Sequence, residues 1–367
     1  MPVDRQSPVI AKLEHQHEYN HNIPDILIEL AQDFKNIAFR GAITNFATTY
    51  YSKEFSTLRD EVTMIRDFES RLVKEYLGAD MANVLDRMMR ADLAAAAIEE
   101  SYRDHFIHAF QDFLTGTVII DRFYDDFSKW YSPILNRNPR TSLEASWLLA
   151  ALLHDQFKPL PVISRFVHQE FQLPPDLLDN ERNTVLVGNL SSLYNHVWSG
   201  GSLESWIPPN STFIHPLSDI LLTHLKNGNH GVVAGLALLN DKLQDDINRA
   251  MVHSAALSVA LHDDKGRGPR EMLLAQKIFP IEMEKFPLVV LMLYCDAVQE
   301  WNRSLNSKAD LVEITFLDKE VIFLLRFKSK LSREEKEKEF SSVDKCIATC
   351  PIKLSYANAT YLGPSPP

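Results

Sequence analysis

Apolar residues recur at intervals of three and four positions along most of the first 300 residues, which predicts helices rather than strands. In the first third of the chain this pattern covers 24–39, 56–78 and 79–100. Pro24 suits the first turn of a helix, and Gly78 marks a stop between the second and third segments. We therefore expect residues 1–100 to form a helical extension that packs around the later helices or forms a dimer surface.

The stretch 144–159, EASWLLAALLHDQFKP, is apolar on every side until it reaches His154 and Asp155. A helix of this composition is buried inside a bundle. An unpaired ionised carboxylate is very costly there, so Asp155 needs a partner. A metal ion is the usual partner where a neutral imidazole and a carboxylate converge, and a hydrogen bond between the two side chains or to a helix end is the alternative.

Other histidines and carboxylates occupy similarly apolar, helical sequence. His105 and His108 lie three residues apart in a predicted helix over 101–126 and so share nearly one face. The helical stretch 215–264 contributes His224, His230, His253 and His262. Asp296 interrupts the apolar run FPLVVLMLYCDAVQEWNR, so it is a second carboxylate that needs a partner.

Local signals mark the element ends and a change of texture near residue 308. We expect a loop over 130–140, and Thr141 with Glu144 fits a capping box that begins the helix leading to His154. Two strand-like runs flank Asp318 and Lys319 as a hairpin, and PIKLSYA predicts a third strand. Between them, Ser332 and Glu335 fit a second capping box, and the Lys/Glu run that follows is typical of a solvated helix face.

The amino-acid composition limits the classes of function and the partners that the chain could have. The 367 residues are 45% hydrophobic and 24% charged, which is enough for two or three packed units. A formal charge of −11 argues against a broad nucleic-acid surface or an anionic membrane surface. Only three cysteines and no apolar run of about 20 residues favour a cytoplasmic protein. The polar N-terminal segment contains His15, His17 and His21, which fit either a mobile tail or a metal-binding tract. The stretch 199–211 fits either a surface loop or a lid.

In chain order the sequence offers His108, His154-Asp155, His230, His262 and Asp296. Over about 101–303 this order resembles the HD-domain superfamily of metal-dependent phosphohydrolases, whose pattern is H, then HD, then a distal D on a helical bundle. The chain is also similar to bacterial HD proteins with an HG element, here His230-Gly231, and a late LxxDxxQEW element, here LMLYCDAVQEW. The expected fold is mainly α: an HD-type bundle over 101–305, the extension 1–100, and a small α+β unit over 306–367.

The resemblance implies a ligand set. His108, His154, Asp155 and Asp296 would hold one metal, Asp155 would bridge to a second, and His230 and His262 would complete the second position. Lys158 stands four residues after His154, as in the HD-x-x-K form, where the lysine faces the substrate phosphate. The chain departs from the family at Asp112, where an apolar residue is usual, and at Gln156 and Phe157, which replace a small residue. His105 is a rival of His108 for the first ligand, and His253 is a rival of His262.

These residues predict a metal-dependent phosphohydrolase acting on a nucleotide or small phosphate ester through a metal-activated water, with Lys158 and Asp155 as catalytic groups. Nitrogen and carboxylate ligands suit one or two ions of Fe, Mn, Zn, Co or Ni. Further cations for the phosphate, or plain surface charges, are Arg103, Lys265 and Arg267. A di-iron oxygenase of HD type, or a non-catalytic sensor or scaffold, remains an alternative, and the chain could form a homo-oligomer.

Overall fold

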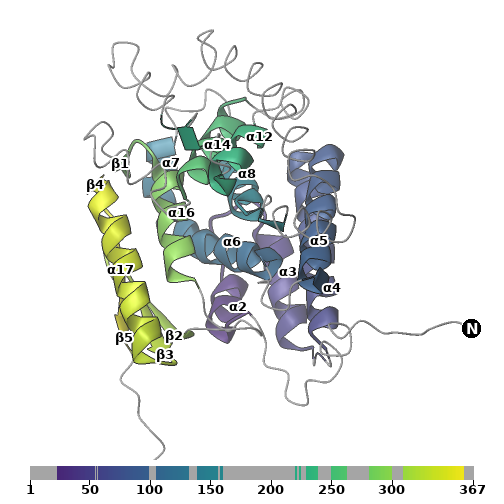
Figure 1. Cartoon of the computed structure of the whole chain (residues 1–367), viewed down its shortest axis with the longest axis horizontal. Helices are drawn as coiled ribbons and strands as arrows, with labels where there is room; N and C mark the ends of the chain where they lie inside the picture. Colours follow the sequence, from purple (N-terminus) through teal and green to yellow (C-terminus); the bar gives the residue numbers. More distant parts are fainter. Residues whose placement is uncertain are drawn as a thin grey trace, which may run out of the picture.

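The computed structural model describes residues 23–53, 55, 57–98, 105–131, 139–155, 158–159, 220, 223–224, 229–238, 249–262, 281–299 and 309–358. This part of the chain is mostly helical and ends in a small strand unit, as the sequence predicted (Figure 1). No helix in the described ranges is long and apolar enough to cross a membrane.

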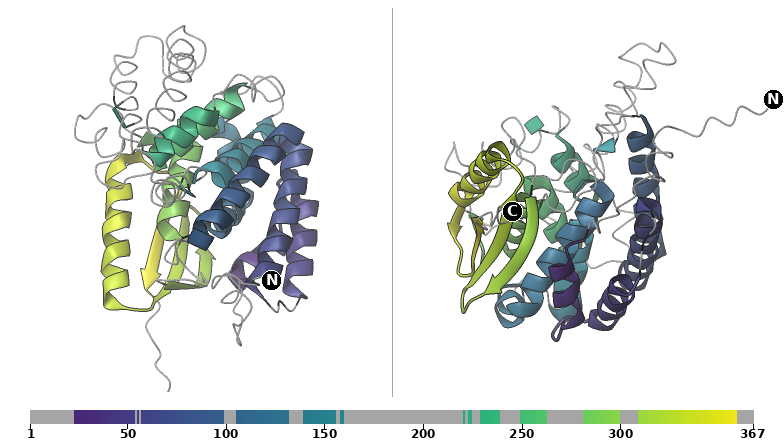
Figure 2. Two further views of the ribbon diagram at one scale, coloured as in Figure 1. Left: turned by 45° about the vertical axis from the view of Figure 1, so that its right-hand side comes forward. Right: turned by 90° about the horizontal axis from the view of Figure 1, so that it is seen from below.

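Four helices make up the described part of the extension: α2 (Asp25–Gln32), α3 (Arg40–Tyr51), α4 (Leu58–Leu77) and α5 (Ala79–Ile98). The helix predicted over 24–39 ends early, because residues 33–39 turn and their backbone N–H groups at Lys35, Asn36 and Ile37 donate to the carboxylate of Asp121. Gly78, at a φ of 91° that favours glycine, separates α4 from α5 as predicted. The two helices pack side by side (Figure 2).

The central bundle consists of α6 (His105–Arg122), α7 (Tyr124–Tyr131), α8 (Pro139–Leu153), α12 (His230–Leu238), α14 (Arg249–His262) and α16 (Pro287–Val298). Helix α6 packs on α8, α8 on α14, and α14 on both α12 and α16. The helix predicted over 101–126 breaks at Phe123, and the predicted loop 130–140 is shorter at both ends. Helix α8 begins two residues before Thr141, and Glu144 is not used in a capping box: its Oε2 accepts the backbone N–H of Ala38, 2.6 Å away.

A close approach between α6 and α8 sets the centre of the bundle. A Cβ placed on Gly116 would lie 2.0 Å from Cζ2 of Trp147, so only glycine fits beneath the indole. The indole Nε1 donates to the carbonyl oxygen of Phe113, 3.1 Å away. This contact holds together the two helices that carry His108 and His154.

The strand unit comprises β2 (Ala309–Phe316), β3 (Glu320–Phe327), α17 (Lys330–Cys346), β4 (Ile347–Thr349) and β5 (Lys353–Asn358). β2 and β3 form the predicted antiparallel hairpin, and β5 pairs in parallel with the other side of β3. β4 pairs with β1 (Ile281–Glu282), which precedes α16. The N-cap of α17 is Ser329 instead of Ser332, because the Ser329 side chain accepts the backbone N–H of Ser332.

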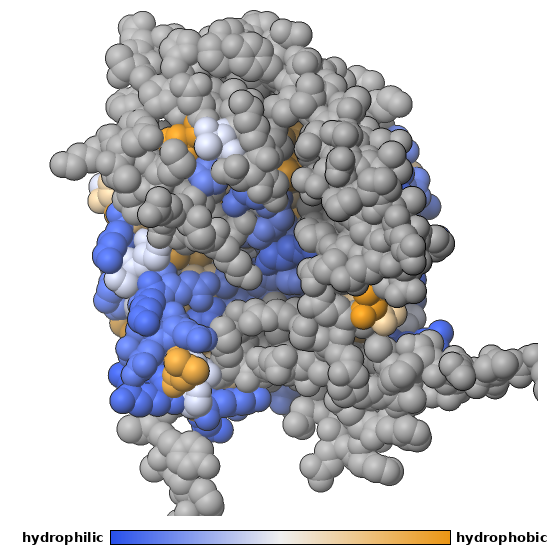
Figure 3. All heavy atoms as spheres, in the orientation of Figure 1, coloured by the Kyte–Doolittle hydropathy of each residue, from blue (hydrophilic) through white to orange (hydrophobic). Residues whose placement is uncertain are grey.

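Helix α17 docks on α16 through polar as well as apolar contacts. The ammonium of Lys336 is buried, with 2% exposure, and donates to the carbonyl oxygens of Ala297 (2.9 Å) and Gln299 (3.2 Å). The hydroxyl of Tyr294 donates to Asp344, 2.6 Å away. The prediction of a solvated Lys/Glu face is therefore wrong at Lys336, whereas the outer side of α17 is hydrophilic (Figure 3).

Candidate metal centre

Five helices bring histidine and aspartate side chains to one place in the bundle. His108 and Asp112 lie one turn apart on α6, and Asp296 lies in the last turns of α16. The other four stand at helix ends: His154 and Asp155 directly after α8, His230 at the start of α12 and His262 at the end of α14. All six residues predicted as ligands are thus brought together, and Asp112 joins them.

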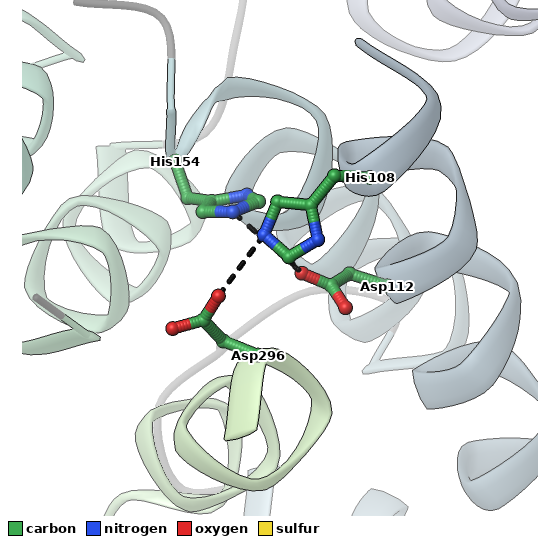
Figure 4. A group of neighbouring side chains, drawn as sticks. All are labelled: His108, Asp112, His154 and Asp296. Carbon is green, nitrogen blue, oxygen red and sulfur yellow. Dashed lines mark hydrogen bonds and ion pairs between the residues drawn. The ribbon is translucent and has the colours of Figure 1, made fainter. Parts of the chain in front are cut away.

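The first group contains His108, Asp112, His154 and Asp296 (Figure 4). The Nε2 atom of His108 lies 3.0 Å from Oδ1 of Asp296 and 3.5 Å from Oδ2 of Asp112. The same Asp112 oxygen is 3.6 Å from Nε2 of His154. The two imidazoles and two carboxylates therefore point at one small volume.

The second group surrounds Asp155. Its Oδ1 lies 3.5 Å from Nε2 of His154, 3.3 Å from Nε2 of His230 and 3.4 Å from Nε2 of His262. Its other oxygen, Oδ2, is 2.9 Å from Nδ1 of His105 and 2.6 Å from the ammonium of Lys158. One carboxylate oxygen thus faces three imidazoles, and the other is held by a histidine and a lysine.

Hydrogen bonds fix which imidazole nitrogen faces the centre. Nδ1 of His154 donates to the carbonyl oxygen of Ala151 (2.8 Å), and Nδ1 of His262 donates to that of Val259 (2.6 Å). Nδ1 of His108 donates to Oε1 of Gln299. In a neutral imidazole the other nitrogen then carries a lone pair, so Nε2 of His154 and Nε2 of His262 present lone pairs to the aspartates. Nε2 of His108 differs, because it is hydrogen-bonded to Oδ1 of Asp296 at 3.0 Å.

The donor set fits a metal ion. Nε2 of His154, Nε2 of His262 and Oδ1 of Asp155 are buried and have no hydrogen-bond partner among the described residues, although they face one another. Ligands about 2.0–2.1 Å from a tetrahedral ion stand about 3.3–3.4 Å apart. The separations of 3.3–3.5 Å around Oδ1 of Asp155 match that spacing. The buried His/Asp cluster could therefore hold a metal ion, and it is compatible with the HD-type ligand set.

The surroundings favour the neutral imidazole of His154 and the ionised carboxylates of Asp155 and Asp296. These are the forms that bind metals. Burial lowers the pKa of His154 to about 4. Burial by itself would raise the pKa of Asp155, but His154 and Lys158 outweigh it and hold that pKa well below its usual range. The hydrogen bond from His108 similarly outweighs burial and lowers the pKa of Asp296.

His105 and His253 are the alternatives to His108 and His262 as ligands. His105 contacts Asp155 through Nδ1 and lies outside both ligand groups, whereas His108 lies within the first. The side chain of His253 lies outside the described residues. Lys158 forms an ion pair with Asp155 and is 18% exposed. The remaining predicted features also lie outside the described residues: Arg103, Lys265, Arg267, the N-terminal histidines and the loop 199–211.

Two participants were missed by the sequence reasoning. Asp112 was noted only as a departure from the family pattern, although its position four residues after His108 places it on the same helix face. Gln299 belongs to the LxxDxxQEW element but had no assigned role. Its Oε1 accepts from His108 and its Nε2 donates to Oε1 of Gln111, so it orients the first imidazole.

Comparison with known proteins adds no further assignment, because no family model matches the chain and no curated protein or solved structure is significantly similar to it.

Proposed function

We propose that the protein is a metal-dependent phosphohydrolase that acts on a nucleotide or another small phosphate ester. One observation carries the proposal: three buried imidazole Nε2 atoms converge on a single oxygen of Asp155, at 3.3–3.5 Å. In the neutral rings the Nε2 atoms of His154 and His262 carry lone pairs, and a bound cation would offset their repulsion from the carboxylate oxygen. The HD-type order of the same residues along the chain supports the assignment to phosphoester hydrolysis.

In this proposal His108, His154, Asp155 and Asp296 hold one ion, and Asp155, His230 and His262 hold a second. When bound, such ions polarise a phosphoryl oxygen and lower the pKa of a coordinated water. The imidazole and carboxylate donors suit Fe, Mn, Zn, Co or Ni. The hydrogen bonds from Nδ1 of His154 and His262 to carbonyl oxygens hold each ring in its ligating orientation.

In this proposal Lys158 binds the phosphate of the substrate. Its ammonium sits 2.6 Å from Oδ2 of Asp155, next to the ligand groups, and it is partly exposed. A cation there offsets negative charge on the phosphoryl oxygens as the transition state forms. His105 shares Oδ2 of Asp155, so this oxygen keeps a partner when Lys158 turns toward a substrate.

The test begins with elemental analysis of the purified protein beside His154→Ala and a control, Glu69→Gln, which alters a buried carboxylate outside both ligand groups. We expect metal in the wild type and the control and little in His154→Ala. A screen of nucleotides and small phosphomonoesters with the metal found should then release phosphate in the same two proteins only.

Two results would contradict the proposal. A wild-type protein that takes up no Fe, Mn, Zn, Co or Ni would favour a sensor or scaffold. A protein that binds iron anaerobically, consumes oxygen on exposure to air and releases no phosphate would favour the oxygenase alternative.

A further inference from the structure

We infer that Asp112, in place of Asp155, is a protein ligand of the first ion, so that this position is formed by two histidines and by the two aspartates Asp112 and Asp296, drawn from α6, α16 and the end of α8. The inference rests on the proposed metal site and extends it, because the resemblance gives this helix position an apolar residue. It changes the charge and the metal preference expected of the centre.

The first argument is geometric. Ligand atoms of His108, Asp112, His154 and Asp296 all lie within 4.8 Å of one another. Oδ2 of Asp112 lies 3.5 Å from one imidazole Nε2 and 3.6 Å from the other, close to the spacing of two ligands on one first-row metal ion. Figure 4 shows the carboxylate of Asp112 directed at the two rings from the helix that carries His108.

The second argument concerns protons. Nδ1 of His154 donates to a backbone carbonyl oxygen, so its Nε2 carries no proton while the ring is neutral. His108 is bonded through both ring nitrogens instead, Nδ1 to Oε1 of Gln299 and Nε2 to Oδ1 of Asp296, the latter at 3.0 Å. The unprotonated Nε2 of His154 therefore faces the Asp112 carboxylate at 3.6 Å, and a cation between these two atoms turns their repulsion into attraction.

The third argument compares the contacts of the Asp155 carboxylate with those of the Asp112 carboxylate. Oδ2 of Asp155 is also within 3.7 Å of Nε2 of His108, but His105 and Lys158 hold that oxygen at 2.9 and 2.6 Å. Oδ1 of Asp155 faces His230 and His262, which belong to the second position. Asp112 is thus better placed than Asp155 to complete the first position together with Asp296.

An extra carboxylate has chemical consequences. With neutral imidazoles, Asp112, Asp155 and Asp296 bring three negative charges to the centre, against one positive charge from Lys158. Carboxylate ligands favour harder ions such as Mn²⁺, whereas imidazoles also suit Zn²⁺. Loss of the Asp112 carboxylate should therefore weaken Mn²⁺ binding more than Zn²⁺ binding.

The experiment compares Asp112→Leu, which restores an apolar residue, and Asp112→Asn, which keeps the size of the side chain, with the wild type. Asp121→Asn is the matched control, because Asp121 is a largely buried carboxylate on the same helix that binds backbone N–H groups instead. Each protein is loaded with Co²⁺, Mn²⁺ or Zn²⁺, and the metal per chain, the affinity by chelator competition and the visible spectrum of the Co²⁺ form are measured.

We expect both Asp112 variants to lose at least about tenfold to hundredfold in affinity for one ion, since removing a group that merely supports a ligand already has that effect. The Co²⁺ spectrum should change in band position and intensity, because the number of protein ligands falls. Asp121→Asn should match the wild type in all three measurements.

Wild-type affinity and an unchanged Co²⁺ spectrum in Asp112→Asn would overturn the inference while leaving the proposed metal site intact. Weaker binding with an unchanged Co²⁺ spectrum would also overturn it, since Asp112 would then only position the histidines. Absence of metal from the wild type would overturn the proposed function itself. If Asp112→Leu does not fold, Asp112→Asn decides the outcome.

Discussion

Two buried carboxylates in this molecule have opposite properties. Glu69 on α4 is fully buried, and both of its oxygens have no hydrogen-bond partner among the described residues. Burial raises its pKa well above the usual range, which favours the neutral form. Asp155 is 3% exposed, yet His154 and Lys158 hold its pKa well below the usual range, so it is ionised. Burial alone therefore removes a charge, and only the surrounding donors and cations preserve one.

Lys336 and Asp121 extend this comparison, because each is a buried charged side chain that makes hydrogen bonds to several backbone groups. Lys336 donates to two carbonyl oxygens and to Glu339, and Asp121 accepts from three consecutive backbone N–H groups. These groups fix the positions of helices. The cluster around Asp155 differs because, among the described residues, Nε2 of His154 and Nε2 of His262 have no hydrogen-bond donor beside them.

The largest expected effect is that of Asp155→Asn. The amide cannot supply a negative oxygen to His154, His230 and His262, so metal affinity should fall by more than about 100-fold, beyond the effect of losing a supporting group. Elemental analysis after reconstitution and desalting measures it. Full metal content in Asp155→Asn would contradict the prediction, because the Asp155 carboxylate would then contribute no more to metal binding than the Glu69 carboxylate does.

Lys336→Met should cost about 2–3 kcal/mol of unfolding free energy, because it leaves the carbonyl oxygens of Ala297 and Gln299 without their buried ammonium donor. Denaturant unfolding in EDTA measures this loss separately from metal binding. Lys338→Met, on the exposed side of the same helix, is the control and should change stability by less than about 0.5 kcal/mol. Equal losses in the two variants would show that the buried contacts contribute nothing.

Asp121→Asn should destabilise the protein by about 1–2 kcal/mol, since one carbonyl oxygen replaces a carboxylate that accepts from Lys35, Asn36 and Ile37. Amide hydrogen exchange at these three positions should become faster. Unchanged exchange would mean that the turn between α2 and α3 holds its shape without the carboxylate.

Glu69→Gln should have the smallest effect at pH 5 and a growing one above it. Because the folded pKa exceeds the ordinary 4.5, the folded protein keeps a proton that the unfolded chain releases as the pH rises. The wild type therefore loses up to about 1.4 kcal/mol per pH unit through this group, until the pH passes the folded pKa. Glutamine cannot lose the proton, so the variant should gain stability over the wild type from pH 5 to 8, measured by urea unfolding in EDTA. A constant difference across this range would show that Glu69 is ionised in the folded protein.

Much of the fold follows from local pattern. The three- and four-residue apolar period predicted the bundle helices, two strand-like runs predicted the hairpin at Asp318, and the glycine predicted the stop at Gly78. The cost of burying Asp296 in an apolar run marked it as a candidate site residue. Other features depend on distant segments. The contact of Glu144 with Ala38 replaces a plausible capping box, and Lys336 is buried by docking on α16 within a run that looks solvated. Asp112 becomes a candidate ligand only because the fold brings His154, at the end of α8, next to it.

Gln299 connects the strand unit to the ligand cluster within a single residue. Its backbone carbonyl oxygen accepts from Lys336 of α17, while its side chain accepts from His108. A shift of α17 along α16 would thus move the side-chain amide that accepts from Nδ1 of His108. Helix α17 and His108 are thus two hydrogen bonds apart, so a molecule that binds and displaces α17 would also disturb the ligand cluster in the bundle.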